Sequence, residues 1–179
     1  MAVARCKGCT GTHVRIAPAY IASVIREHSD RYLCENSFCT GMVIFAVPDY
    51  GVLFKCQAEG RLIDLEFGAF FSLLRFVEKS MAGEKIGQLC VYSSLPEFVF
   101  AFSGRSRHLA PDSERMRLLK ERTAKLGASV SYIEPSRNLA LYSPADYPAV
   151  PKGKKVVVLS TLSDDTRKLF RPIQKGIRI

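Results

Sequence analysis

The chain contains no apolar run approaching the ~20 residues that a helix needs to cross a lipid bilayer. Its first residues, MAVARCKGC, also contain no apolar leader region. We therefore expect a cytoplasmic protein without a membrane partner. In that compartment the six cysteines argue against a disulfide framework and leave metal ligation or simple burial.

The sequence also contains no phosphate-binding G-x-x-x-x-G-K-[ST] loop, no G-x-S-x-G elbow and no G-x-G-x-x-G turn. A cysteine nucleophile would be Cys56 or Cys90, with one of the three histidines as its base. Both cysteines stand inside apolar, strand-like runs, where the thiolate is disfavoured. The sequence therefore predicts none of the common motif-bearing enzyme classes.

Acidic residues are scarce relative to basic ones: there are 17 against 26, and the net charge is +9. Residues 151–179 contain eight basic and two acidic side chains. This excess favours a polyanionic partner such as nucleic acid, although a basic tail can also serve solubility alone. The basic residues that we expect to contact phosphates are Arg105, Arg107, Arg115, Arg122, Lys152, Lys154 and Lys155.

Four of the cysteines have spacings that suit a metal site. Cys6, Cys9, Cys34 and Cys39 follow the pattern C-x2-C-x24-C-x4-C. Four thiolates can close a tetrahedral zinc site, and an iron–sulfur centre is a second reading of the same ligands. Such a metal would clamp the N-terminal arm and produce an interaction scaffold for a protein partner. The alternative is that these are reduced cysteines that behave as small hydrophobic residues.

A β-hairpin is predicted from two apolar runs, residues 42–47 and 52–58, joined by the turn sequence PDYG. Before it, PAYIASVIREH predicts a short amphipathic helix over residues 18–28, with Pro18 in its first turn. A brief strand is expected over residues 31–34.

The longest predicted helix covers residues 63–79, IDLEFGAFFSLLRFVEK. Ile63, Phe67, Phe70 and Leu74 recur at helical spacing. Because most of the circumference is apolar, we expect this helix to be buried against a sheet. Glu66 stands on the apolar side, where a carboxylate is either paired, functional, or placed to complement the helix dipole.

The second half of the chain continues the alternation of strands and helices. The patterns predict strands over residues 89–92, 98–102, 129–133 and 156–159, a strand or turn over 138–142, and helices over 113–126 and from residue 163. Together they indicate an α/β domain, with a mixed sheet, an antiparallel N-terminal hairpin, and helices packed on the sheet. We divide the chain into an N-terminal arm (1–30), a core domain (31–150) and a basic C-terminal extension (151–179).

The order of these elements resembles that of the ribonuclease H-like superfamily over about residues 31–150. That fold has three antiparallel strands, a helix, a parallel strand, a second helix and a last strand. The resemblance implies carboxylates that hold two magnesium or manganese ions for phosphodiester cleavage. It places them on the first strand, at the start of the first helix, at the end of the fourth strand and near the end of the domain.

The matching positions in this chain are Glu35, Glu66, Ser93 and Asp146. Serine supplies no charge to a metal site, so the resemblance predicts a degenerate relative that retains the fold. We expect such a domain to bind nucleic acid or a nucleoprotein partner through its basic surface. The alternatives are a metal-dependent nuclease that uses Glu35, Glu66 and Asp146, and the metal-clamped scaffold.

Overall fold

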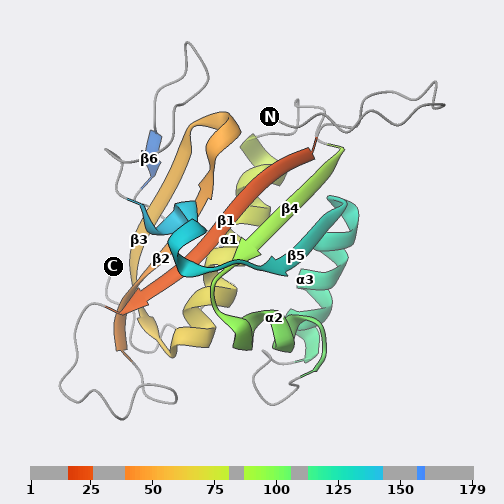
Figure 1. Ribbon diagram of the computed structural model, residues 1–179. Helices are drawn as coiled ribbons and strands as arrows, with labels where there is room; N and C mark the ends of the chain where they lie inside the picture. Colours follow the sequence, from red (N-terminus) through yellow and green to blue (C-terminus); the bar gives the residue numbers. More distant parts are fainter. Residues whose placement is uncertain (1–15, 26–38, 81–86, 106–112, 143–156, 160–179) are drawn as a thin grey trace.

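The computed structural model describes residues 16–25, 39–80, 87–105, 113–142 and 157–159. In these residues a six-stranded sheet has the order β5-β4-β1-β2-β3-β6, with helices on one face (Figure 1). The strands are β1 (Ile16–Ile25), β2 (Cys39–Val47), β3 (Val52–Gly60), β4 (Gln88–Ser93), β5 (Ala128–Tyr132) and β6 (Val157–Leu159). The helices are α1 (Leu62–Ser80), α2 (Pro96–Phe102) and α3 (Ser113–Lys125).

The sheet is mixed. Strands β1, β2 and β3 pair antiparallel, whereas β4 pairs parallel to β1, β5 parallel to β4, and β6 parallel to β3. Three antiparallel strands, the helix α1, the parallel strand β4, further helices and the last strand β5 follow one another along the chain. The predicted α/β class and the ribonuclease H-like order of elements are therefore confirmed.

The helix predicted over residues 18–28 is wrong, because residues 16–25 form the strand β1 between β2 and β4. Ala17, Ala19 and Ile21 are buried on the face that carries the helices, and Ala22 is buried on the other. A strand covered on both faces has no polar side, so its sequence lacks strict alternation. The strand also lies before residue 31, where we expected the core domain to begin.

The hairpin is confirmed. Strands β2 and β3 pair in register from Val47↔Val52 to Cys39↔Gly60. A single 3-10 turn, η1 (Pro48–Tyr50), joins them and ends at Gly51, whose φ of 65° is left-handed and favours glycine. Strand β3 is followed directly by α1, which packs on the sheet.

Helix α1 has the apolar stripe that its spacing predicts. Ile63, Phe67, Phe70 and Leu74 are all buried against the sheet and the other helices. The start of the helix comes very close to β2, since a Cβ on Gly41 would lie 2.7 Å from Leu65 Cδ1 and 2.9 Å from the backbone oxygen of Val24. Glycine at this position therefore lets α1 approach the strands that carry the candidate site.

The strand predicted over residues 98–102 is also wrong, because these residues belong to helix α2. Pro96 begins the helix, and Phe98, Ala101 and Phe102 then face α1 at helical spacing. The ring of Phe98 meets Phe67 edge to face at 4.9 Å between centroids. A short apolar run fits a strand or a buried helix equally well, and here the aromatic contacts with α1 favour the helix.

The remaining predicted elements that fall on described residues are confirmed as β4, α3, β5 and β6. The segment after β5 then crosses the face of the sheet opposite α1, as Figure 1 shows. It forms two 3-10 turns, η3 (Pro135–Arg137) and η4 (Leu139–Leu141). Ala140 packs on Ala22, Ile44 and Leu53 in a second, smaller core. Residues 138–142 are therefore a turn, which was one of the two predicted outcomes.

Several predictions concern residues outside the described ranges. These are the strand over 31–34, the helix from residue 163, and the side chains of Cys6, Cys9, Cys34 and Cys39, although the backbone of Cys39 begins β2. Among the described residues, no three potential ligands converge on a metal-sized site. Within those ranges no helix combines the length and hydropathy required to span a membrane.

Candidate functional site at the carboxyl ends of two parallel strands

Glu66 is the centre of the candidate site. It lies on α1 one turn past the start of the helix, and only 1% of its surface is exposed. The hydroxyl of Ser93 donates a hydrogen bond of 2.5 Å to Glu66 Oε1, and Ser23 Oγ lies 2.7 Å from Glu66 Oε2. Each carboxyl oxygen thus has a serine hydroxyl within hydrogen-bond distance.

Strand pairing places both serines beside the carboxyl group. Ser93 is the last residue of β4 and lies opposite Ile21 of β1 in the parallel register. Ser23 follows Ile21 by two residues, so both serines project to the face that carries α1. Carboxyl ends of neighbouring parallel strands are the usual location of ligand sites in open α/β sheets. The geometry therefore places this buried carboxyl group where the fold normally places its chemistry.

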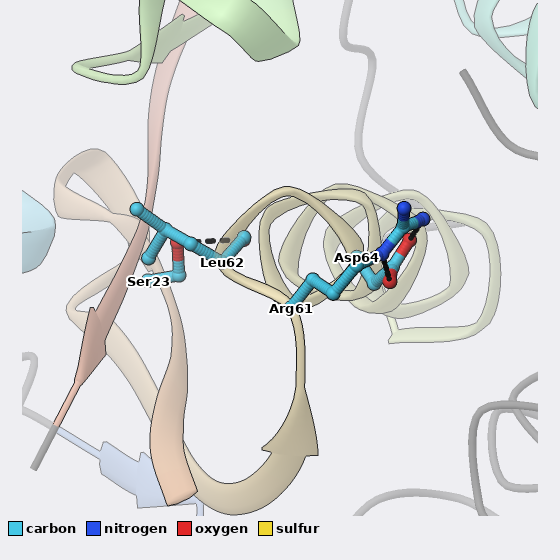
Figure 2. A network of polar contacts seen from close by, with 4 residues as sticks. All are labelled: Ser23, Arg61, Leu62 and Asp64. Carbon is cyan, nitrogen blue, oxygen red and sulfur yellow. Dashed lines mark hydrogen bonds and ion pairs between the residues drawn. The ribbon is translucent and has the colours of Figure 1, made fainter. Parts of the chain in front are cut away.

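Further hydrogen bonds fix the serines. The backbone N–H of Leu95 donates to Ser93 Oγ at 3.1 Å. Ser23 Oγ lies 3.3 Å from the backbone oxygen of Leu62, in the first turn of α1, as Figure 2 shows. Strand β1, helix α1 and the end of strand β4 are consequently joined by one continuous polar network, Ser23–Glu66–Ser93, inside an otherwise apolar core.

The other acidic residue at the start of α1 has a different role. Asp64 is in the first turn and accepts two hydrogen bonds from Arg61, at 2.6 and 2.8 Å (Figure 2). The Asp64 carboxylate complements the positive end of the helix dipole. Glu66 lies deeper and faces the two serines, so helix-dipole complementation does not account for its placement.

Burial raises the pKa of the Glu66 carboxyl group. The hydroxyls of Ser93 and Ser23 and the backbone N–H of Ser23 oppose this increase, because hydrogen bonds to the carboxylate favour the ionised form. The direction of the shift means that the proton is held to a higher pH in the folded domain than in the unfolded chain. No charged side chain is among the causes of the shift.

These residues do not fit a centre for two divalent cations. Mg²⁺ and Mn²⁺ favour charged oxygen ligands, whereas the two side chains that contact Glu66, Ser23 and Ser93, are neutral. The carboxyl group that remains is buried, and both its oxygens are engaged. Glu35 and Asp146, the other two predicted carboxylates, lie outside the described residues.

Ser23 is the site residue that the sequence did not reveal. It was missed because residues 18–28 were interpreted as a helix, so the first strand was sought at residues 31–34. The available signal was a single hydroxyl in the apolar run YIASVI. A polar side chain in a central strand requires a buried partner, and that partner is Glu66.

A second polar anchor lies close to the same strands. Asn138 is fully buried, and its Nδ2 donates to the backbone oxygen of Ile21 and to Ser94 Oγ, both at 2.8 Å. Its Oδ1 accepts a hydrogen bond from the backbone N–H of Ala140. These bonds fasten the crossing segment to β1 and to the residue that follows β4. The junction of β1 and β4 is thus held by separate polar contacts from α1 and from η4.

The predicted phosphate contacts fall on different surfaces. Arg105 is exposed after α2, and Arg115 is half-buried on α3. Arg122 donates a 2.5 Å hydrogen bond to Glu78 of α1 and covers the ring of Phe71 at 5.1 Å, so it helps to attach α3 to α1. The remaining four, Arg107, Lys152, Lys154 and Lys155, lie outside the described residues.

Solved ribonuclease H structures are among those similar to this one. RNase H1 from the halophilic archaeon Halobacterium salinarum NRC-1 has a TM-score of 0.45 at 11% identity, over 70% of this chain and 91% of that chain. The N-terminal RNase H domain of rv2228c from Mycobacterium tuberculosis, solved as a fusion with maltose-binding protein, has a TM-score of 0.41 at 12% identity, over 68% of this chain and 86% of that chain. LC9-RNase H1 has a TM-score of 0.39 at 9% identity, over 72% of this chain and 67% of that chain.

No protein-family model matches the sequence. No curated protein matches it either. The order of strands and helices described above rests on this chain's own strand pairing.

Proposed function

We propose that this chain is a non-hydrolytic, ribonuclease H-like module that binds nucleic acid or a nucleoprotein through a basic surface. The observation that carries the proposal is the state of Glu66. Its carboxyl group is buried and engaged by two serines at the place where the fold would hold catalytic cations. The fold is thus retained while the chemistry of its usual centre is replaced by internal hydrogen bonds.

The distribution of charge supports a polyanionic partner. The chain has a net charge of +9, and α3 contains five basic and two acidic residues. On that helix Lys120 and Lys125 are exposed, whereas Arg117 is engaged with Glu121 and Glu114. Such positive charges suit a phosphate backbone rather than individual bases. They come from Lys120 and Lys125, from Arg105, and from Lys152, Lys154 and Lys155.

The test is binding of single- and double-stranded RNA and DNA at increasing salt concentration. If the module uses phosphate contacts, log K falls linearly with log salt. Arg105→Gln should reduce the magnitude of that slope by about 0.7–0.9, the contribution of one phosphate contact. The combined change Lys152→Gln, Lys154→Gln and Lys155→Gln should reduce it further.

The matched control is Arg137→Gln, which removes the same charge from an exposed position on η3, on the opposite side of the sheet. This variant should keep the slope of the unmodified protein. Absence of binding even at low salt contradicts the module. Cleavage of the bound nucleic acid with Mg²⁺ or Mn²⁺, abolished by Glu66→Gln, contradicts its non-hydrolytic character.

A further inference from the structure

The Ser23–Glu66–Ser93 network contains a hydrogen-bonding imbalance that only one protonation state resolves. Ser23 Oγ lies within hydrogen-bond distance of two oxygens, Glu66 Oε2 at 2.7 Å and the backbone oxygen of Leu62 at 3.3 Å. A hydroxyl has a single proton to donate. When Glu66 is ionised, its Oε2 and the backbone oxygen of Leu62 can both only accept hydrogen bonds. Ser23 Oγ then donates its proton to one of these oxygens and has no proton to share with the other.

A neutral Glu66 removes the imbalance. If Oε2 carries a proton, it donates to Ser23 Oγ, and the Ser23 hydroxyl donates in turn to the backbone oxygen of Leu62. On the other side, the N–H of Leu95 donates to Ser93 Oγ, and the Ser93 hydroxyl donates to Glu66 Oε1. Every contact then contains one proton, in a continuous chain from Leu95 to Leu62. Complete satisfaction is the expected condition of a buried polar network.

We propose that Glu66 is a neutral carboxylic acid in the folded domain and that the network is a proton-dependent lock between β1, α1 and β4. The lock occupies the position at which the fold would use a metal centre to join the same three elements. Loss of the proton leaves a buried carboxylate with no cationic side chain beside it in the part of the chain that the structure describes. The strand ends and the start of α1 therefore loosen as the pH rises.

Among the described residues, other titratable groups do not supply a compensating charge. At the start of α1, Arg61 and Asp64 bind each other. Tyr20, Cys90 and Tyr92 of β1 and β4 alternate with the serines and face away from α1. The remaining titratable groups on the surrounding described elements are Arg75, Glu78 and Lys79 of α1, Lys55, Cys56 and Glu59 of β3, Glu97 of α2, the charged residues of α3, and Tyr132 of β5. None of them is among the causes of the raised pKa of Glu66, which are burial and its contacts with Ser93 and Ser23.

The sign of the expected pH dependence follows from the raised pKa. Below the ordinary pKa of glutamate, both the folded and the unfolded chain hold the proton, and the lock contributes its full stability. Between the ordinary pKa and the raised folded pKa, only the folded chain holds it. In that interval the folding equilibrium constant falls by up to tenfold per pH unit as the pH rises.

Urea denaturation of the full chain between pH 4 and pH 9 tests the lock against a matched pair of variants. Glu66→Gln should remove the tenfold fall of the folding equilibrium constant per pH unit, because the amide cannot ionise. Glu97→Gln, which neutralises an exposed carboxylate on α2, should retain it. Equal pH slopes in the two variants would overturn the proposal.

Infrared spectroscopy of the unmodified protein gives a second readout that does not require Glu66→Gln to fold. The carbonyl band of a neutral carboxylic acid should be present at neutral pH and disappear at alkaline pH. Ser93→Ala should move its disappearance to a higher pH, because the Ser93 hydroxyl favours the ionised form. Absence of the band at neutral pH, or a shift in the opposite direction in Ser93→Ala, would contradict a neutral Glu66.

Discussion

Replacing Ser23 and Ser93 together by aspartate is expected to make the stability of this domain depend on divalent cations. The two serines flank Glu66 from the first and fourth strands, at 2.7 and 2.5 Å from its oxygens. Two new carboxylates would therefore share a buried pocket with a third. Burying an uncompensated charge costs several kcal/mol, so the metal-free double variant should lose a large share of the 5–15 kcal/mol typical of a domain.

A divalent cation should recover part of this loss, because three converging carboxylates form a hard-oxygen site. At a Mn²⁺ concentration of about one hundred times Kd, the recovered stability is about 2.7 kcal/mol. The measurement is thermal unfolding with Mn²⁺, with Mg²⁺ and with a chelator. A rise in the unfolding temperature with Mn²⁺, reversed by the chelator, is the expected result.

Two controls separate site formation from general charge effects. Ser23→Asn with Ser93→Asn has the same shape without the charge and should show no response to Mn²⁺. Ser129→Asp with Ser131→Asp adds the same charge on β5, where both serines are exposed, and should also show none. If all three double variants respond equally, the response to Mn²⁺ does not depend on carboxylates at positions 23 and 93.

The sequence was sufficient for those elements whose local pattern agrees with their environment. The turn PDYG between two apolar runs specifies a hairpin, and a long stripe at helical spacing specifies α1. The unusual position of Glu66 was also visible, since a carboxylate on the apolar side of a buried helix requires a partner. The resemblance also grouped Ser93 with Glu66. What could not be read was the second partner, Ser23, because it is brought to Glu66 only by the pairing of β1 with its neighbouring strands.

Strand β1 and helix α2 were misread for a common physical reason. Neither shows the polar face that distinguishes a period of 2 from a period of 3.6, because exposed positions such as Val24 and Phe100 are themselves apolar. In β1 the residues Ile21, Val24 and Ile25 coincide with a helical stripe, although they lie on a strand. In α2 the run FVFAF has the composition of a strand. In each case, contacts with distant elements decide the structure.

Because α2 is a helix, Phe98 packs it against α1, and Phe98→Ala is expected to destabilise the domain by about 3–5 kcal/mol. The Phe98 ring is fully buried and lies 4.9 Å from Phe67, 5.6 Å from Phe70 and 6.1 Å from Phe102, between centroids. Truncation would leave a cavity among these rings, and α2 is too short to close it by local rearrangement. Urea denaturation at a pH below the ordinary glutamate range measures the loss while the lock is fully protonated.

Phe100→Ala is the matched control, because it deletes the same ring from the same helix at a position that is 45% exposed. Its effect should stay below about 1 kcal/mol, within the range typical of surface changes. A comparable loss in both variants would mean that α2 does not depend on its contacts with α1. Since Leu95, which holds Ser93 in place, immediately precedes α2, Phe98→Ala should also weaken the Ser93–Glu66 contact. The infrared band of neutral Glu66 should then broaden, whereas Phe100→Ala should leave it unchanged.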